Sequence, residues 1–219
     1  MNSTDRYDGC FNRFSFQINK MGKYVSITIP IVEKLKDEDI MQFALEYILL
    51  RIVSFIEEFL GCIILIGGCW QEALLRSYFL DFGSDKAKTD VQGGCNLGSL
   101  IHYAKSEISF KNNAKKIERI FRHLFGLSPF PDQKTKDIIL DMVLVRNVII
   151  HEGGWPSEEH FRQVRTSGAI KISRTIKMSA GETSFYKLEI TDKKFVVNAV
   201  MAVQSLMQHL NSGIRKGAS

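Results

Sequence analysis

The feature that most constrains the fold is a helical period of apolar residues between positions 37 and 60, in DEDIMQFALEYILLRIVSFIEEFL. Apolar residues recur there at positions i, i+3, i+4 and i+7, which places them on one face of an α-helix. Three acids begin the segment, where the helix dipole favours negative charge. A helix with so broad an apolar face must be covered by other elements, so we expect a helical core.

Further helices are predicted by the same apolar spacing in residues 62–82, 97–107 and 113–124. Another helix is predicted to end at Gly153 and Gly154. We expect Gly61 to separate the first two helices, and we expect the polar, glycine-bounded residues 83–94 to form a loop. The helical core then spans about residues 37–154, and a capped C-terminal helix follows at about residues 192–212.

Two segments alternate apolar and polar residues and therefore predict β-hairpins, at about residues 13–29 and 170–190. No repeat, low-complexity stretch or long linker divides the sequence, so a single domain over residues 1–219 is expected. The expected fold class is α+β, mainly α, with the hairpins at the periphery.

The composition excludes several classes of protein. Hydrophobic residues make up 45% of the chain, enough for a packed core. The longest uncharged apolar run, residues 59–71, is shorter than the ~20 residues that a membrane-spanning helix needs. The first residues lack the features of a secretory signal, so we expect a cytoplasmic protein without a membrane-spanning segment.

The four cysteines and five histidines do not predict a metal site. The cysteines contain no C-x-x-C pair, and we expect them to be reduced thiols. The histidines do not have the spacing of zinc ligands. We therefore expect neither a metal nor a cofactor.

The formal charge of +5 is unevenly distributed, because residues 161–219 contain ten Lys or Arg against three Asp or Glu. A basic surface suits a polyanion such as RNA, although a run of charge is more often simply a solvated face. The candidates for RNA backbone contacts lie on the outer face of the helix at 113–124 and on the segment KISRTIK. They are Lys115, Lys116, Arg119, Arg122, Lys171, Arg174 and Lys177.

The segment LVRNVIIHEGGWP places three polar residues, Arg146, Asn147 and His151, in a helix that is otherwise apolar. Asn147 and His151 lie about 40° apart around a helix axis, and Arg146 lies about 100° from Asn147. All three side chains therefore reach one edge of the last turn. Histidine exchanges protons near neutral pH, whereas arginine presents planar donors that match phosphate.

Metal-free cleavage of RNA needs a base for the 2′-OH proton, an acid for the leaving 5′ oxygen and a cation for the charged transition state. One histidine per chain supplies half of the acid-base pair. Two copies of the helix about a twofold axis supply both halves, so this interpretation predicts a homodimer.

The alternative from the residues alone is structural. His151 then interacts with the carbonyls of the helix end, and Arg146 pairs with a buried acid such as Glu57, Glu58 or Asp141. Exposure of His151 distinguishes the two interpretations, because the structural one requires burial against an acid of the same chain.

The whole phrase VRNVIIHEGG closely resembles the signature of the HEPN superfamily (higher eukaryotes and prokaryotes nucleotide-binding), in which R-x(4 to 6)-H lies near the end of a late helix. Arg146, Asn147 and His151 match this pattern residue by residue. A looser resemblance covers residues 37–154, including the acids of VSFIEEFLG. It implies an antiparallel helical bundle in which Glu57 or Glu58 lies near the motif in a supporting role.

The resemblance implies a metal-independent endoribonuclease at a homodimer cleft, which leaves a 2′,3′-cyclic phosphate. Arg146 would bind the scissile phosphate, His151 would act as acid or base, and Asn147 would orient them. The family implies a toxin-antitoxin or anti-phage setting, in some cases with a nucleotidyltransferase-type antitoxin as partner. Other members only bind RNA, nucleotides or proteins, which is the main alternative.

Overall fold

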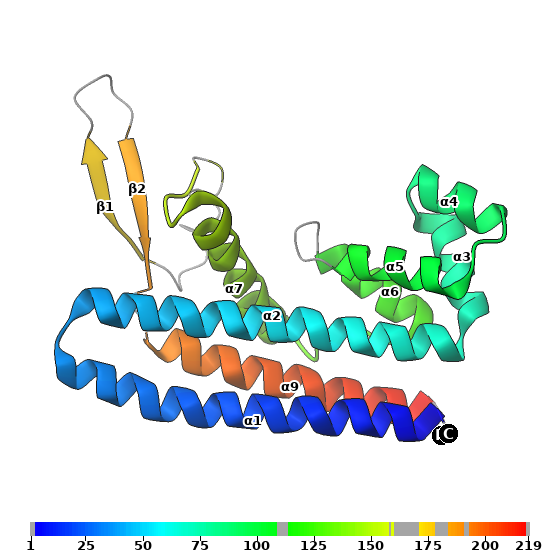
Figure 1. Ribbon diagram of the computed structural model, residues 1–219, viewed down its shortest axis with the longest axis horizontal. Helices are drawn as coiled ribbons and strands as arrows, with labels where there is room; N and C mark the ends of the chain where they lie inside the picture. The colour runs from blue at the N-terminus through cyan, green and yellow to red at the C-terminus, as the bar shows by residue number, and fades with distance from the viewer. Residues whose placement is uncertain are drawn as a thin grey trace. The chain divides into compact units, whose positions relative to one another are not determined.

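The computed structural model describes residues 3–108, 114–157, 159, 171–177, 184–190 and 193–217 of the chain, with only the backbone described for most of the two strands. These residues are mostly helical, as the sequence predicts. In chain order the elements are α1 Ser3–Leu35, α2 Glu38–Trp70, α3 Glu72–Phe82, α4 Asp85–Gln92, α5 Leu97–Ile108, α6 Ala114–Phe125, α7 Gln133–Glu152, β1 Lys171–Lys177, β2 Ser184–Glu189 and α9 Lys193–Gly217 (Figure 1).

The hairpin predicted for residues 13–29 is wrong, because this segment belongs to the long helix α1. The buried apolar residues of α1 are three, four or seven positions apart, which is helical spacing. They are Tyr7, Phe14, Ile18, Val25, Ile29 and Val32. The apparent alternation came from apolar residues that the helix leaves exposed, such as Phe16 and Ile27.

The break predicted at Gly61 is also wrong, because α2 continues through Gly61, Gly67 and Gly68 to Trp70. A side chain at Gly67 would collide with the ring of Phe125, which lies in α6. The glycine therefore permits close packing of two helices instead of ending one.

Residues 83–94, predicted to be a loop, contain the short helix α4. Its N-cap is Ser84, whose hydroxyl oxygen accepts a hydrogen bond of 3.3 Å from the backbone N–H of Ala87. The helix ends at Gly93 and Gly94, and Gly94 has a positive φ of 79°. The N-cap and the burial of Ala87 and Val91 stabilise this helix, although the polar composition of the segment favours a loop.

The chain packs into two compact units. Unit 1 comprises Met1–Gln17, Phe55–Gln133 and Gln204–Ser219, and unit 2 comprises Ile18–Ser54 and Lys134–Val203. Helices α1, α2 and α9 contribute residues to both units. The single domain expected over residues 1–219 stays a prediction.

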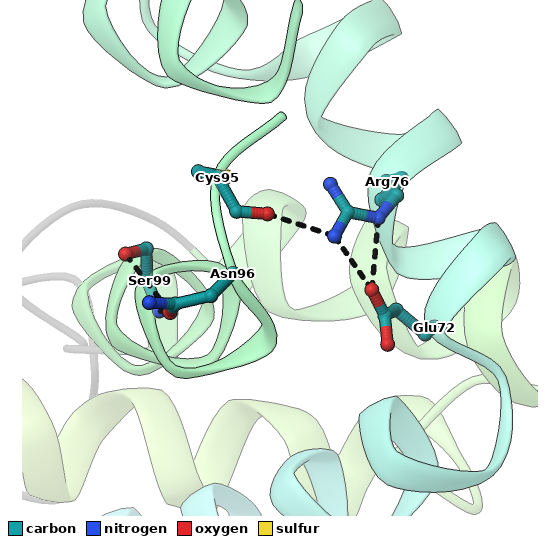
Figure 2. A network of polar contacts seen from close by, with 5 residues as sticks. All are labelled: Glu72, Arg76, Cys95, Asn96 and Ser99. Carbon is teal, nitrogen blue, oxygen red and sulfur yellow. Dashed lines mark hydrogen bonds and ion pairs between the residues drawn. The ribbon is translucent and has the colours of Figure 1, made fainter. Parts of the chain in front are cut away.

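In unit 1, aromatic rings join the start of α1 to α2. The ring of Phe14 packs edge-on against Phe55 and Phe59, with centroid distances of 5.4 and 5.3 Å. Figure 2 shows a polar network that fixes α3 to the segment before α5. In it, Arg76 donates to the Glu72 carboxylate at 2.6 Å and to the Cys95 carbonyl at 2.8 Å.

In unit 2, β1 and β2 pair antiparallel within the segment predicted as the second hairpin, with Lys171 opposite Glu189 and Lys177 opposite Ser184. The connecting residues 178–183 lie outside the described part of the chain. The backbone N–H of Ile190 donates to the side-chain oxygen of Gln42 in α2 at 3.0 Å, so the residue after β2 is fixed to that helix.

Among the residues that the structure describes, no helix combines the length and the apolar character needed to cross a bilayer.

Candidate functional site

The motif lies in unit 2, at the C-terminal end of α7. The helix is held by its apolar face, on which Ile139, Met142, Val145 and Val148 are almost completely buried. Each fully buried side chain of this kind stabilises the fold by about 1.5–3 kcal/mol. This burial fixes the orientation of α7 about its axis and therefore which side of the motif faces outward.

Two glycines end α7 just after the motif. Gly153 and Gly154 have positive φ angles of 59° and 84°, a conformation that favours glycine. The backbone N–H of Gly154 donates to the carbonyl oxygen of Val148 at 3.2 Å. The backbone N–H of Trp155 donates to the carbonyl oxygen of Glu152 at 3.0 Å. Such closure is typical of a helix C-terminus, and it leaves His151 in the last turn of α7.

The three motif residues lie within the last turn and a half of α7. A guanidinium N–H of Arg146 (Nη1) donates to the carboxamide oxygen of Asn147 at 2.9 Å. Arg146 and Asn147 are half-buried, whereas His151 is exposed. The end of α7 thus combines the Arg146 guanidinium, which Asn147 holds by a hydrogen bond, with the accessible imidazole of His151. His151 is therefore not buried against an acid of its own chain. The pairing of Arg146 with an acid, the other part of the structural alternative, stays a prediction.

The two acids suggested as supporting residues, Glu57 and Glu58, belong to unit 1, whereas the motif belongs to unit 2. Glu58 forms an exposed ion pair of 3.5 Å with Arg13 of α1. Both acids line a hollow of about 420 Å³. A supporting role for them in the motif stays a prediction.

The basic residues predicted on residues 113–124 do lie on one helix, α6, in unit 1. Lys115, Arg119 and Arg122 are exposed, and Lys116 is half-buried. Three of these cations line an open hollow of about 470 Å³. Its lining is Phe82, Lys115, Glu118, Arg119, Arg122 and His123.

Sequence reasoning missed the aromatic part of this hollow, which Phe82 of α3 and His123 of α6 provide. The guanidinium of Arg119 lies 4.8 Å from the centroid of the Phe82 ring. His123 packs edge-on against Tyr78 at 5.7 Å. The 41 positions that separate Phe82 from His123 carry no sequence signal of this contact. A surface with both cations and exposed aromatic atoms suits a single-stranded nucleic acid better than cations alone.

The other basic candidates, Lys171, Arg174 and Lys177, lie on β1 in unit 2. Only their backbone is described, and Arg174 pairs with Lys187 of β2 in the register of the sheet. Contacts of these side chains with RNA therefore stay a prediction.

No group of His, Cys, Asp and Glu among the described residues has an arrangement that could hold a metal ion. Comparisons of the chain with protein-family models, with curated proteins and with solved structures found no match. A functional conclusion therefore rests on the motif, its geometry and its chemistry.

Proposed function

We propose that the chain is a metal-independent endoribonuclease of HEPN type that acts as a homodimer. The observation that carries the proposal is the end of α7, where Arg146 is hydrogen-bonded to Asn147 and the imidazole of His151, one turn after Asn147, is exposed. The resemblance of VRNVIIHEGG to the HEPN signature assigns the same three residues.

Each residue has a part in the proposed reaction. His151 of one subunit removes the proton from a ribose 2′-OH, and the oxygen attacks the adjacent phosphorus. The partner's His151 protonates the departing 5′ oxygen. The guanidinium of Arg146 binds the phosphate oxygens and stabilises the charge of the transition state. Asn147 holds that guanidinium in place. The products are a 2′,3′-cyclic phosphate and a 5′-OH.

The surface next to the motif supports the dimer. Ile150 is 54% exposed and follows Arg146 by one helical turn, and Trp155 is 38% exposed just after the helix end. These two side chains add exposed apolar area near the motif, which a second copy of α7 would cover. A second copy of α7 on this face would bring two histidines to one cleft, as the chemistry requires.

The proposed setting follows the family resemblance. It is a cytoplasmic toxin-antitoxin or anti-phage system, in which an antitoxin of nucleotidyltransferase type is a candidate partner. The basic residues of α6 in unit 1 and of β1 in unit 2 would contact the RNA backbone.

The test is cleavage of an end-labelled, structured RNA in EDTA by the wild-type protein, Arg146→Ala and His151→Ala. Matched controls are Arg51→Ala and His102→Ala, which remove an exposed arginine and an exposed histidine elsewhere. The proposal predicts cleavage by the wild type and both controls and a loss of about 10²-fold or more in each motif variant. Equal rates in motif variants and controls would contradict it.

The second candidate function is a module that binds RNA, a nucleotide or a partner protein without cleavage. The basic and aromatic hollow on α6 supports it, because this surface offers phosphate contacts and stacking without any acid-base group of the motif. RNA binding by a wild-type protein that does not cleave in the same assay would favour this function.

A further inference from the structure

Two cysteines from different helices meet in unit 1. Cys10 in α1 and Cys62 in α2 occupy facing positions of the two packed helices, and both are half-buried. The helices pack against each other on either side of these positions. Tyr7 packs against Trp70 at 6.0 Å on one side, and Phe14 packs against Phe59 at 5.3 Å on the other. The packing of the helices therefore holds the two cysteines next to each other.

A hollow of about 420 Å³ gives small molecules access to Cys62. Besides Cys62, its walls include the cations Arg13 and Lys105 and the acids Glu57 and Glu58. A thiolate at its edge is therefore accessible to a small oxidant. Arg13 and Lys105 favour its charged form, and Glu58 opposes it.

The proximity of the two cysteines makes their thiols unequal. The hydrogen bond from Cys10, aided by the positive charge of Arg13, lowers the pKa of the Cys62 thiol to about 7. The same hydrogen bond, together with burial, raises the pKa of the Cys10 thiol. Near neutral pH, Cys62 is partly a thiolate and thus a nucleophile, whereas Cys10 keeps its proton.

We propose that Cys10 and Cys62 are a reversible redox pair, in which a peroxide oxidises Cys62 and Cys10 then closes a disulfide between α1 and α2. The pair contains the two features that such a site needs, an accessible thiolate and a second thiol in contact with it. The inference does not depend on the proposed RNA chemistry and is tested without RNA.

The reaction balances with hydrogen peroxide as the oxidant. The Cys62 thiolate attacks one oxygen, so that the S–O bond forms and the O–O bond breaks, and the released hydroxide takes a proton from solvent. The Cys10 thiol then attacks the Cys62 sulfur. The S–S bond forms, the S–O bond breaks, and the hydroxide leaves with the Cys10 proton as water. The sulfur pair loses two electrons, and one peroxide becomes two waters.

The other two cysteines provide matched controls. Cys69 lies in the same helix as Cys62 but is exposed, and Cys95 precedes α5 and is half-buried. Replacing both gives Cys69→Ser/Cys95→Ser, a chain in which Cys10 and Cys62 are the remaining thiols.

The first experiment treats the Cys69→Ser/Cys95→Ser chain with one equivalent of hydrogen peroxide and maps its peptides by mass spectrometry. The expected product is a Cys10–Cys62 linked peptide pair that a dithiol reductant separates. In the wild type, the same link should form in preference to any link with Cys69 or Cys95. Separate oxidation of Cys10 and Cys62, or oxidation of neither, would overturn the proposal.

A second experiment tests the role of Cys10 as a hydrogen-bond donor. Cys10→Ser keeps an O–H that can donate to Cys62, whereas Cys10→Ala removes the donor. The rate at which iodoacetamide modifies Cys62 at pH 7 should stay near the wild-type rate in Cys10→Ser and fall several-fold in Cys10→Ala. Equal rates in the two variants would contradict the contact on which the pair depends.

Discussion

The carboxamide of Asn147 holds the Arg146 guanidinium through a hydrogen bond of 2.9 Å. In Asn147→Ala this support is lost, and the arginine must be ordered at the expense of its side-chain entropy. We expect the single-turnover cleavage rate to fall by about 10-fold, which corresponds to about 1.4 kcal/mol, one hydrogen bond. The loss should be smaller than in Arg146→Ala. An unchanged rate would show that this contact does not position Arg146 for the reaction.

Asp141, one turn before Val145 in α7, predicts a pH dependence of stability. Burial, together with the negative charge of Asp137, raises the pKa of Asp141 to about 6. The folded state therefore binds a proton more tightly than the unfolded state, whose pKa stays near 3.9. This group stabilises the fold at low pH and loses that contribution as the pH rises through about 6.

The test is urea unfolding of the wild type and Asp141→Asn at pH 4 and pH 7.5. At pH 7.5 we expect the variant to be more stable by about 1–2 kcal/mol. This is less than the free energy equivalent to the whole pKa shift of Asp141, because solvent screens a half-buried group. At pH 4 the difference should nearly vanish. Asp81→Asn, at an exposed carboxylate of α3, serves as the control. A gain for Asp141→Asn that is the same at both pH values would contradict the assignment.

At the scale of single residues, the sequence predicted the motif but not the surroundings of the basic residues. Arg146, Asn147 and His151 lie within one helical turn and a half, so their closeness along α7 follows from helix geometry. The approach of Phe82 to Arg119 depends on how α3 packs on α6, which local periodicity does not contain. For the same reason, the facing positions of Cys10 and Cys62 could not be predicted from their spacing.

Among the elements, α2 offers a matched pair of glycine substitutions. A Cβ at Gly61 meets no atom within 4 Å, whereas a Cβ at Gly67 collides with the Phe125 ring. Gly61→Ala should therefore stabilise the protein by about 0.5–1 kcal/mol through helix propensity. Gly67→Ala should destabilise it by about 1–3 kcal/mol because α6 must move. Chemical denaturation measures both, and shifts of the same sign would contradict a continuous α2 packed on Phe125.

The errors in predicting the elements have a common physical cause. The alternation in residues 13–29 is a short pattern, whereas the buried positions of α1 follow a helical period over 33 residues. β-branched residues such as Val25 and Ile29 made the strand interpretation plausible, but packing outweighed their intrinsic preference. The long periodic segments in α2, α6, α7 and α9 were recognised because their apolar faces repeat over several turns.

At the scale of the whole molecule, the placement of charge predicts how the proposed binding of RNA depends on salt. Arg119 and Arg122 line the hollow on α6 in unit 1. Removing both in Arg119→Ala/Arg122→Ala should weaken binding of single-stranded RNA and reduce the slope of log K against log salt by about 1.4, since each phosphate contact contributes about 0.7. Fluorescence anisotropy over a salt series measures this slope.

The control for that experiment is Lys86→Ala/Lys88→Ala, which removes the same charge from α4 in the same unit. Its salt slope should stay close to that of the wild type. If both double variants change the slope equally, the effect is one of net charge, and α6 is not a specific RNA surface.

The long apolar periods predicted a mainly helical protein, and the hydrophobic content predicted that it could bury a core. The division into two compact units could not be predicted from the sequence. Helices α1, α2 and α9 contribute to both, so no linker or change in composition marks a boundary. The homodimer stays a prediction that follows from the chemistry of one histidine per motif.

The measurement that tests the central claim most directly is the identity of the RNA ends formed in EDTA, determined by mass spectrometry of a defined oligonucleotide. The proposed reaction of Arg146 and His151 predicts a 2′,3′-cyclic phosphate and a 5′-OH, and no cleavage when the 2′-OH at the cut site is replaced by hydrogen. A 3′-OH with a 5′-phosphate, or equal cleavage of the 2′-deoxy substrate, would contradict it, because the attacking oxygen would then come from water.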